Sequence, residues 1–148
     1  MAHIITSRCR TEKIENKRSR FQIIIDNLFF PLRALFAPEN SFLGLTSLRD
    51  ERMEIVAKQA CGRILEIGCG PGNIFIKNWT NSESVGIDVF AYDGVELVHE
   101  DMTNLPFEDE SFDTVTLIAV GGHIPQHTKV NEFIEISRVL KPKGKLIM

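Results

Sequence analysis

The sequence has few of the residues that cross-link a chain, bind metals or span a membrane. Its three cysteines, Cys9, Cys61 and Cys69, are too scattered for a disulfide framework and lack the spacing of metal ligands. Reduced thiols in a cytoplasmic protein are therefore expected. No apolar run approaches the ~18 residues of a membrane span, and the N-terminus lacks the pattern of a signal peptide. These absences predict a soluble protein without a structural metal.

Positive charge is missing from the middle of the chain. Residues 78–128 contain no Lys or Arg and ten carboxylates, whereas residues 1–20 carry six Lys or Arg against two Glu, a net charge of +4. An acidic region repels phosphate-rich polymers, so nucleic acid is not an expected substrate. An acidic surface suits a positively charged ligand, although a solvated surface without a role is the alternative.

The 148 residues are enough for one domain but few for a complete α/β enzyme. Residues 1–45 read as a basic and hydrophobic helical extension, and residues 46–148 as the main domain. Ten apolar residues fall within 21–36, where Pro31 predicts a helix to about Phe30 and an irregular or short helical piece after it. This piece could be a lid over a substrate pocket or a peripheral membrane contact helped by the basic residues. Docking on the sheet or on a second subunit is the alternative.

Glycine is concentrated in one stretch of the chain. Gly68, Gly70 and Gly72 stand at alternate positions directly after the apolar run 64–67, Ile-Leu-Glu-Ile. The run predicts a strand buried on both faces of a parallel sheet. Without Cβ atoms, the turn can adopt positive φ and let a ligand approach closely. A helix from residue 73 would point its free N–H groups back at the turn and complete a nucleotide-type cradle.

The spacing of the glycines separates two ligand classes. Dinucleotide folds use G-x-G-x-x-G, and Asn73 stands where the third glycine of that motif would fall. Glu66, at the end of the strand and under the turn, also suits a cationic ligand better than a pyrophosphate. A glycine turn in some other α/β protein stays open as the alternative at this point.

Further apolar segments predict strands at residues 84–88, 96–99 and 112–120, and a fifth strand from residue 145. A helix that starts near residue 46 and is ended by Gly62 precedes the central strand, and an amphipathic helix over 130–140 precedes the fifth.

Polar and glycine residues follow these predicted strands. Asp88 ends the second strand, twenty residues beyond Gly68, where an acid in nucleotide-binding folds accepts from both ribose hydroxyls. Because ligands bind beyond the carboxyl ends of parallel strands, residues 68–73, 88, 101–102 and 119–124 are expected to line one crevice.

Four motifs in order resemble those of a class I S-adenosylmethionine-dependent methyltransferase of the small-molecule type, similar to ubiquinone and sterol methylases. They are E-x-G-x-G-x-G from Glu66, Asp88, Asp101-Met102 within EDMTNLPF, and the run ESFDTVTLIAVGGHIP followed by ISRVLKPKGKLIM. The resemblance covers residues 63–148 and implies a Rossmann-like, doubly wound, mostly parallel α/β sheet that binds S-adenosylmethionine. The implied cofactor-binding residues are Glu66, Gly68, Cys69, Gly70, Gly72, Asn73, Asp88, Asp101, Met102 and Ala119.

The chain departs from the family pattern at two places. Residues 89–95 are too few for the usual helix between the second and third strands, so a loop is expected. The family's last two strands are absent, which would leave the sheet truncated after strand five with an exposed edge. Either the sequence is a fragment, or a homo-oligomer or another partner covers that edge.

The resemblance implies methyl transfer to a small-molecule, lipid or cell-surface precursor acceptor by in-line displacement. His123, on the loop after strand four, is the candidate general base because histidine titrates near neutral pH. A structural or cofactor-contacting role is its alternative, and His127 and His99 have weaker claims.

Two other functions compete with an active methyltransferase. One is a truncated, inactive regulatory or partner module; the other, disfavoured by Asn73 and Asp101-Met102, is a nicotinamide dehydrogenase.

Overall fold

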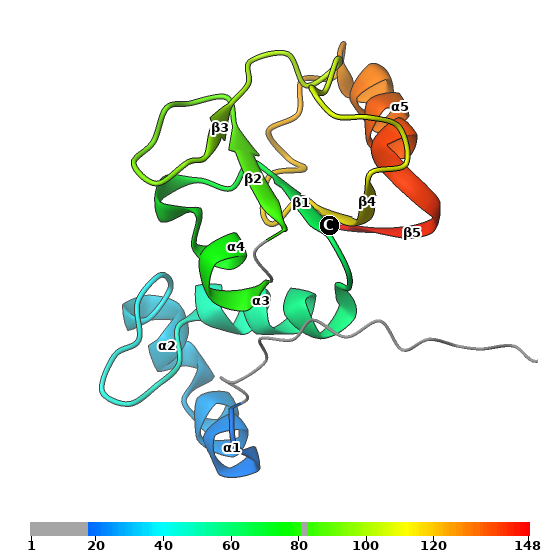
Figure 1. Cartoon of the computed structure of the whole chain (residues 1–148). Helices are drawn as coiled ribbons and strands as arrows, with labels where there is room; N and C mark the ends of the chain where they lie inside the picture. The colour runs from blue at the N-terminus through cyan, green and yellow to red at the C-terminus, as the bar shows by residue number, and fades with distance from the viewer. Residues whose placement is uncertain (1–17, 81–82) are drawn as a thin grey trace, which may run out of the picture.

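A computed structural model describes residues 18–80 and 83–148 of the chain. Five strands form one sheet in the order β3-β2-β1-β4-β5 (Figure 1), and every strand pair is parallel. The strands are β1 Ile64–Ile67, β2 Val85–Asp88, β3 Leu97–Val98, β4 Phe112–Thr116 and β5 Leu140–Ile147. The predicted fold class is therefore confirmed, and the segment between β2 and β3 is a loop, as its length predicted.

Alternate residues of β1 face opposite sides of the sheet and build two cores. Ile64 packs with α3 (Leu48–Gln59) and α4 (Ile74–Trp79) through Ala57, Phe75 and Trp79. Leu65 and Ile67 belong to the other core, which α5 (Lys129–Val139) covers with Ile136 and Val139. Helices thus cover both faces, and the β1 run is buried throughout, as a central parallel strand requires.

Several predicted element ends are corrected by the structure. The helix before β1 begins after Ser47, whose hydroxyl accepts from the Asp50 N–H at 3.0 Å, but ends at Gln59 rather than at Gly62. Gly62 has φ +65°, and a Cβ there would collide with the Asp113 side chain. Glycine at this position is therefore required by the turn into β1. The fourth strand ends at Thr116 instead of residue 120, because residues 118–123 form turns.

The last helix and strand also differ from prediction. In the helix predicted to be amphipathic over 130–140, Val130 and Ile134 are exposed, whereas Glu132 is buried on the face of Ile136 and Val139. The strand β5 follows α5 directly at Leu140, and its register with β4 shifts between Phe112 and Thr114. Residues 141–144, between the predicted helix over 130–140 and the strand predicted from residue 145, form this irregular start of β5.

Two short helices, α1 (Arg20–Leu28) and α2 (Phe30–Phe36), precede α3. The break between them at Phe29 agrees with the interruption predicted from Pro31, which lies in the first turn of α2. Figure 1 places the pair beyond α3, on the far side from the loops that follow β3 and β4. Among the described residues, no helix combines the length and apolarity needed to cross a membrane.

Charged side chains join α1 and α2 to α3. The buried Arg33 donates to Glu51 at 2.6 Å and to the Thr46 carbonyl at 2.8 Å. Arg18 contacts three carboxylates, at 3.1, 2.9 and 2.7 Å, which belong to Asp26, Glu51 and Glu54. We call these five side chains the α1–α3 ionic network.

Candidate functional site

The glycine turn after β1 has the backbone that its sequence predicted. Gly68, Gly70 and Gly72 have φ values of 73°, 65° and 81°, and residues 71–73 form a short 3₁₀ helix before α4. A Cβ on Gly70 would meet no atom within 4 Å, so the turn leaves open space on that side. Glycine at this position therefore lets a ligand come close to the backbone.

The N–H groups of the turn itself, residues 68–73, are paired within the protein, whereas the donors predicted at the start of the following helix stay a prediction. Gly68 and Cys69 both donate to the Ile87 carbonyl, at 2.8 and 3.0 Å. Gly72 donates to the Asp93 carbonyl at 2.7 Å, and Asn73 to that of Gly70 at 3.3 Å. The remaining N–H, of Gly70, donates to an Asp88 carboxylate oxygen at 2.9 Å. With Pro71 lacking an N–H, this turn offers no donor to a pyrophosphate.

Asp88, at the end of β2, is held in place by backbone donors. Its Oδ2 accepts from Gly70 and its Oδ1 from the Phe90 N–H at 3.0 Å. The side chain is buried yet lines the cavity described below. Each oxygen has a second lone pair, so this oriented carboxylate can accept from the two hydroxyls of a ribose.

Glu66 is a buried carboxyl group with unused hydrogen-bonding capacity. Burial, and then the nearby charge of Asp88, raise its pKa to about 8. Its Oε2 has no hydrogen-bond partner among the described residues. A buried acid in this state gains from a nearby positive charge, which would favour its ionised form.

Two further polar side chains without partners lie beside Glu66. Glu66 pairs in register with Gly86 of β2 and Thr116 of β4, so all three share one face of the sheet. The Asn73 side chain occupies the space where a Cβ of Gly86 would lie. Within the described residues, neither the amide atoms of Asn73 nor the Thr116 hydroxyl has a hydrogen-bond partner. The turn therefore covers a buried polar cluster, which is costly unless a ligand or solvent satisfies it.

A cavity of about 660 Å³ lies at the carboxyl ends of the strands. It brings together six of the predicted site residues: Gly68, Gly70, Asp88, Asp101, Met102 and His123. Its lining includes the carboxylates of Asp88, Glu100, Asp101 and Glu132 but no Lys or Arg. No residue of α1 or α2 lines it either, so the lining gives no support to a lid, which was one alternative for residues 21–36. The cavity is suited to a neutral or cationic ligand.

Five predicted cofactor residues lie outside the cavity lining: Glu66, Cys69, Gly72, Asn73 and Ala119. Glu66 and Asn73 lie beneath the turn, and Gly72 is held against the β2–β3 loop near Gly94. Burial and the charges of Glu66 and Asp88 raise the pKa of Cys69 to about 12, so its thiol stays protonated. Ala119 has φ +61° in the turn after β4. Their contact with a cofactor stays a prediction.

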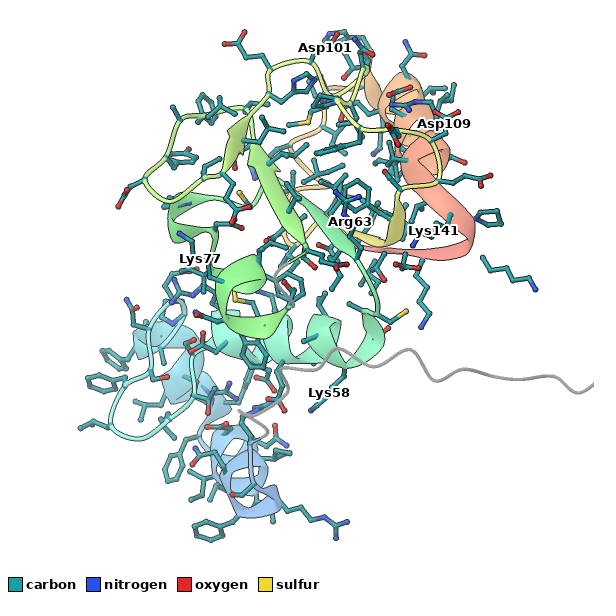
Figure 2. The ribbon with its side chains drawn as sticks, viewed as in Figure 1. Lys58, Arg63, Lys77, Asp101, Asp109 and Lys141 are labelled. Carbon is teal, nitrogen blue, oxygen red and sulfur yellow. The ribbon has the colours of Figure 1, made fainter. Side chains whose placement is uncertain are left out.

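Asp101 and Met102 stand on the loop after β3. Figure 2 shows Asp101 at the loop end of the molecule, opposite Lys58 on α3. Its Oδ1 accepts from the N–H and hydroxyl of Thr103, at 3.0 and 2.6 Å, and these bonds lower the pKa of Asp101. The carboxylate is therefore ionised and fixed at the cavity wall, where it can accept from an amine.

The histidines differ in their access to the cavity. His123 is exposed and lines the cavity, and its backbone N–H donates to the Val120 carbonyl at 2.7 Å. His99 instead contacts the Asn104 carbonyl through Nε2 at 2.8 Å, and neither His99 nor His127 lines the cavity. The structure thus places only His123 of the three where it could meet a ligand.

The sequence reasoning missed cavity residues on α5 and on the β2–β3 loop. Glu132 is buried, and its carboxylate accepts from the Thr128 hydroxyl at 2.6 Å. The signal was its spacing, four residues before Ile136 and seven before Val139, which puts an acid on the buried face of α5. Phe90 and Tyr92 of the β2–β3 loop, with ring centroids 5.6 Å apart, add aromatic surface to the cavity lining.

Residues 65–148, more than half of the chain, match a family profile described as a methyltransferase domain. The chain belongs to this family. Sterol 4-C-methyltransferase strm-1 of Caenorhabditis elegans is 32% identical over 114 residues, covering 66% of this chain and 33% of that protein. Demethylmenaquinone methyltransferase of Bacillus cytotoxicus is 30% identical over 125 residues, covering 72% of this chain and 52% of that protein. A human probable tRNA methyltransferase 9B is 33% identical over 93 residues, covering 57% of this chain and 20% of that protein.

Solved structures show the same fold. The PH0226 protein of Pyrococcus horikoshii matches with a TM-score of 0.54 and 28% identity, covering 67% of this chain and 55% of that one. A Burkholderia thailandensis 1,6-didemethyltoxoflavin-N1-methyltransferase, solved with S-adenosylhomocysteine, matches with a TM-score of 0.52 and 13% identity, covering 98% and 71%. The methyltransferase-domain chain spans about half or less of the length of these curated relatives.

Proposed function

We propose that this methyltransferase-domain chain binds S-adenosylmethionine in the cavity at the carboxyl ends of β1, β2 and β4. The observation that carries the proposal is the pair of buried carboxyl groups, of Glu66 and Asp88, beside a turn whose N–H groups at residues 68–73 are paired within the protein. Such a site rejects a pyrophosphate and accepts a cationic nucleoside, which argues against a nicotinamide dehydrogenase.

The residues present fit the parts of this cofactor. Asp88 is oriented to accept from the ribose hydroxyls, and Asp101 with the N–H of Met102 would hold the adenine. The open side of Gly70 leaves room for the methionine part, and the unpaired Glu66 carboxyl would favour its ammonium group. S-adenosylmethionine, when bound, supplies an electrophilic methyl group on a sulfonium centre.

The chain's own contribution to catalysis would be binding, orientation and exclusion of water. Apolar side chains of Ile67, Val120 and Ile124 line the cavity and can displace solvent from a bound cofactor and acceptor. His123, at the exposed rim, would accept a proton from a hydroxyl or carbon acceptor at a ring nitrogen. Its replacement by Ala should then lower turnover more than cofactor affinity.

We infer that the acceptor is a small molecule or a lipid. The aromatic wall of Phe90 and Tyr92 supports an apolar acceptor, and two of the similar proteins are named for sterol and demethylmenaquinone. One similar protein is named for tRNA, but the four carboxylates and the lack of Lys or Arg in the lining would repel a polyanion.

Calorimetric titration of the purified chain with S-adenosylhomocysteine tests the proposal, with NAD as the control ligand. Micromolar binding of S-adenosylhomocysteine and none of NAD are expected. A screen of lipid and small-molecule acceptors then asks whether the chain transfers a methyl group. A folded chain that binds neither ligand would overturn the cofactor assignment, and a chain that binds without transferring would act as a binding module.

A further inference from the structure

Apolar side chains are unusually exposed on the helix pair α1–α2 and the loop after it. The side chains of residues 28–30 and of Leu32 are all exposed. Phe36 stacks on Phe42 of the loop, with ring centroids 5.7 Å apart. We call these residues the α1–α2 apolar surface: Phe21, Ile24, Leu28, Phe29, Phe30, Leu32, Leu35, Phe36, Phe42 and Leu43. Surfaces of this kind mark sites of interaction with another protein or a membrane.

The opposite, inward side of the helix pair is charged. Asp26 of α1 and Arg33 of α2 are fully buried against α3 in the α1–α3 ionic network. Asp26 also accepts from the Thr46 N–H and from Gln22, both at 3.0 Å. The helix pair therefore buries Asp26 and Arg33 and exposes most of its large apolar residues, the reverse of an ordinary surface helix in water.

The charges around the apolar surface favour an anionic partner. Between residues 19 and 49 the only acids are Asp26, which is buried, and Glu39, which lies 3.8 and 4.0 Å from Arg49 and Arg52. Arg20 is exposed at the start of α1, and residues 8–17, which precede it in the sequence, carry four Lys or Arg against two Glu. Basic charge next to an apolar helix face is the combination that binds anionic bilayers.

A second copy of the chain fits this surface less well. A two-fold interface brings the same patch of both copies together, and both copies carry the same excess of Lys and Arg in the sequence before α1, with no matching acids on the patch. The exposed apolar face of the two helices, next to basic residues in the sequence, instead suits a position in the plane of a membrane interface. We propose that the α1–α2 apolar surface docks on phospholipid bilayers that contain anionic lipids. This surface is separate from the cavity and does not depend on the proposed methyl transfer.

Flotation of the full chain with vesicles tests the proposal. Wild-type protein should float with vesicles containing about a third phosphatidylserine, and less with pure phosphatidylcholine or in high salt, because the attraction is partly electrostatic. The variant Phe21→Gln/Leu28→Gln/Leu35→Gln changes three residues that are 72, 72 and 70% exposed. Partitioning of this variant should fall about tenfold or more, because apolar burial in the interface is lost.

The matched control is Val130→Gln/Ile134→Gln on α5, where both residues are exposed, at 70 and 59%. This control should float like wild type, and both variants should keep wild-type circular dichroism and S-adenosylhomocysteine affinity. Failure of wild type to bind anionic vesicles would overturn the proposal, as would equal losses in both variants. A dimer in sedimentation equilibrium that the triple variant abolishes, without vesicle binding, would instead identify an interface between copies. Cofactor titration of the same samples separates these outcomes from failure of the proposed function.

Discussion

Buried carboxylates occur in two regions of this molecule, with opposite surroundings. In the α1–α3 ionic network, burial raises the pKa of Asp26 and Glu54, but hydrogen bonds from Thr46, Lys58 and Arg18 outweigh it and lower both pKa values. Under the glycine turn, burial and the charge of Asp88 raise the pKa of Glu66 to about 8. Every carboxylate of the network has a cationic partner, whereas Glu66 has none among the described residues.

The paired carboxylates of the network join α1 and α2 to α3, whereas the unpaired carboxyl group of Glu66 is available to a ligand. This difference also sets opposite responses to pH. The lowered pKa values of Asp26 and Glu54 stabilise the folded chain at neutral pH, and this contribution is lost as the pH falls below their ordinary values of 3.8 and 4.5. The raised pKa of Glu66 stabilises the fold at pH 4.5 and below, and this contribution is lost as the pH rises to about 8.

Removing a cation from the network should give the largest effect on stability. Arg33→Met leaves the buried Asp26 and the Glu51 carboxylate short of a donor. We expect a loss of about 3–5 kcal/mol in unfolding free energy, the usual cost of breaking a buried ion pair. Denaturant unfolding measures this loss, and hydrogen exchange should show that α1 and α2 open first. Arg52→Met, at an exposed pair with Glu39, should cost less than about 0.5 kcal/mol, and equal losses would contradict the structural role of the network.

Neutralising Glu66 should instead stabilise the protein at high pH. Between pH 4.5 and 8 the folded chain keeps a proton on Glu66 that the unfolded chain has lost. Glu66→Gln removes this titration, so at pH 8 the variant should exceed wild type in stability by about 4 kcal/mol, and at pH 5 by less than about 1 kcal/mol. Denaturant unfolding of both proteins across this range measures the difference. A difference that does not change with pH would show that Glu66 is already ionised in the fold.

Asp88→Asn tests whether the carboxylate at the end of β2 binds the ligand. The amide keeps an acceptor but loses the charge that strengthens hydrogen bonds to hydroxyls, so affinity for S-adenosylhomocysteine should fall about 10- to 50-fold. Calorimetry measures this change. Asp93→Asn, whose side chain is exposed on the β2–β3 loop, is the matched control and should bind as wild type does. Comparable losses in both variants would mean that general negative charge, rather than Asp88 itself, holds the ligand.

The smallest effect on cofactor binding is expected at His123. Its side chain is exposed at the cavity rim, so His123→Ala should change S-adenosylhomocysteine affinity less than about twofold, in the range of ordinary surface substitutions. With an acceptor identified, turnover should fall and its pH profile should lose the limb due to the base. Unchanged turnover would reject the assignment of His123 as the base.

The sheet and most of the cavity were predictable because they depend on local patterns. Apolar runs ending in Gly68 or Asp88 define strands whose carboxyl ends must meet at one edge of a parallel sheet. The pairing of the turn's N–H groups was not predictable, since their acceptors on Ile87 and Asp93 lie about twenty residues away.

The orientation of α1 and α2 was also hidden, because phenylalanine and isoleucine in a short helix usually indicate its buried side. Asp26 and Arg33, seven residues apart and opposite in charge, were the available sign that the inward side is polar. Composition alone does not reveal which side of a helix faces the protein, because that depends on partners from distant segments, here Thr46 and Glu51.

The contact between Asn73 and Gly86 has a consequence for how this sequence can evolve. The Asn73 amide fills the volume that any side chain at position 86 would need, so a substitution of Gly86 should be accepted only after residue 73 has become smaller. Asn73 is itself in the left-handed region, with φ +47°, a conformation that asparagine and glycine tolerate best. We therefore expect positions 73 and 86 to be epistatic and to vary together among homologues, with glycine at position 73 as the permissive state.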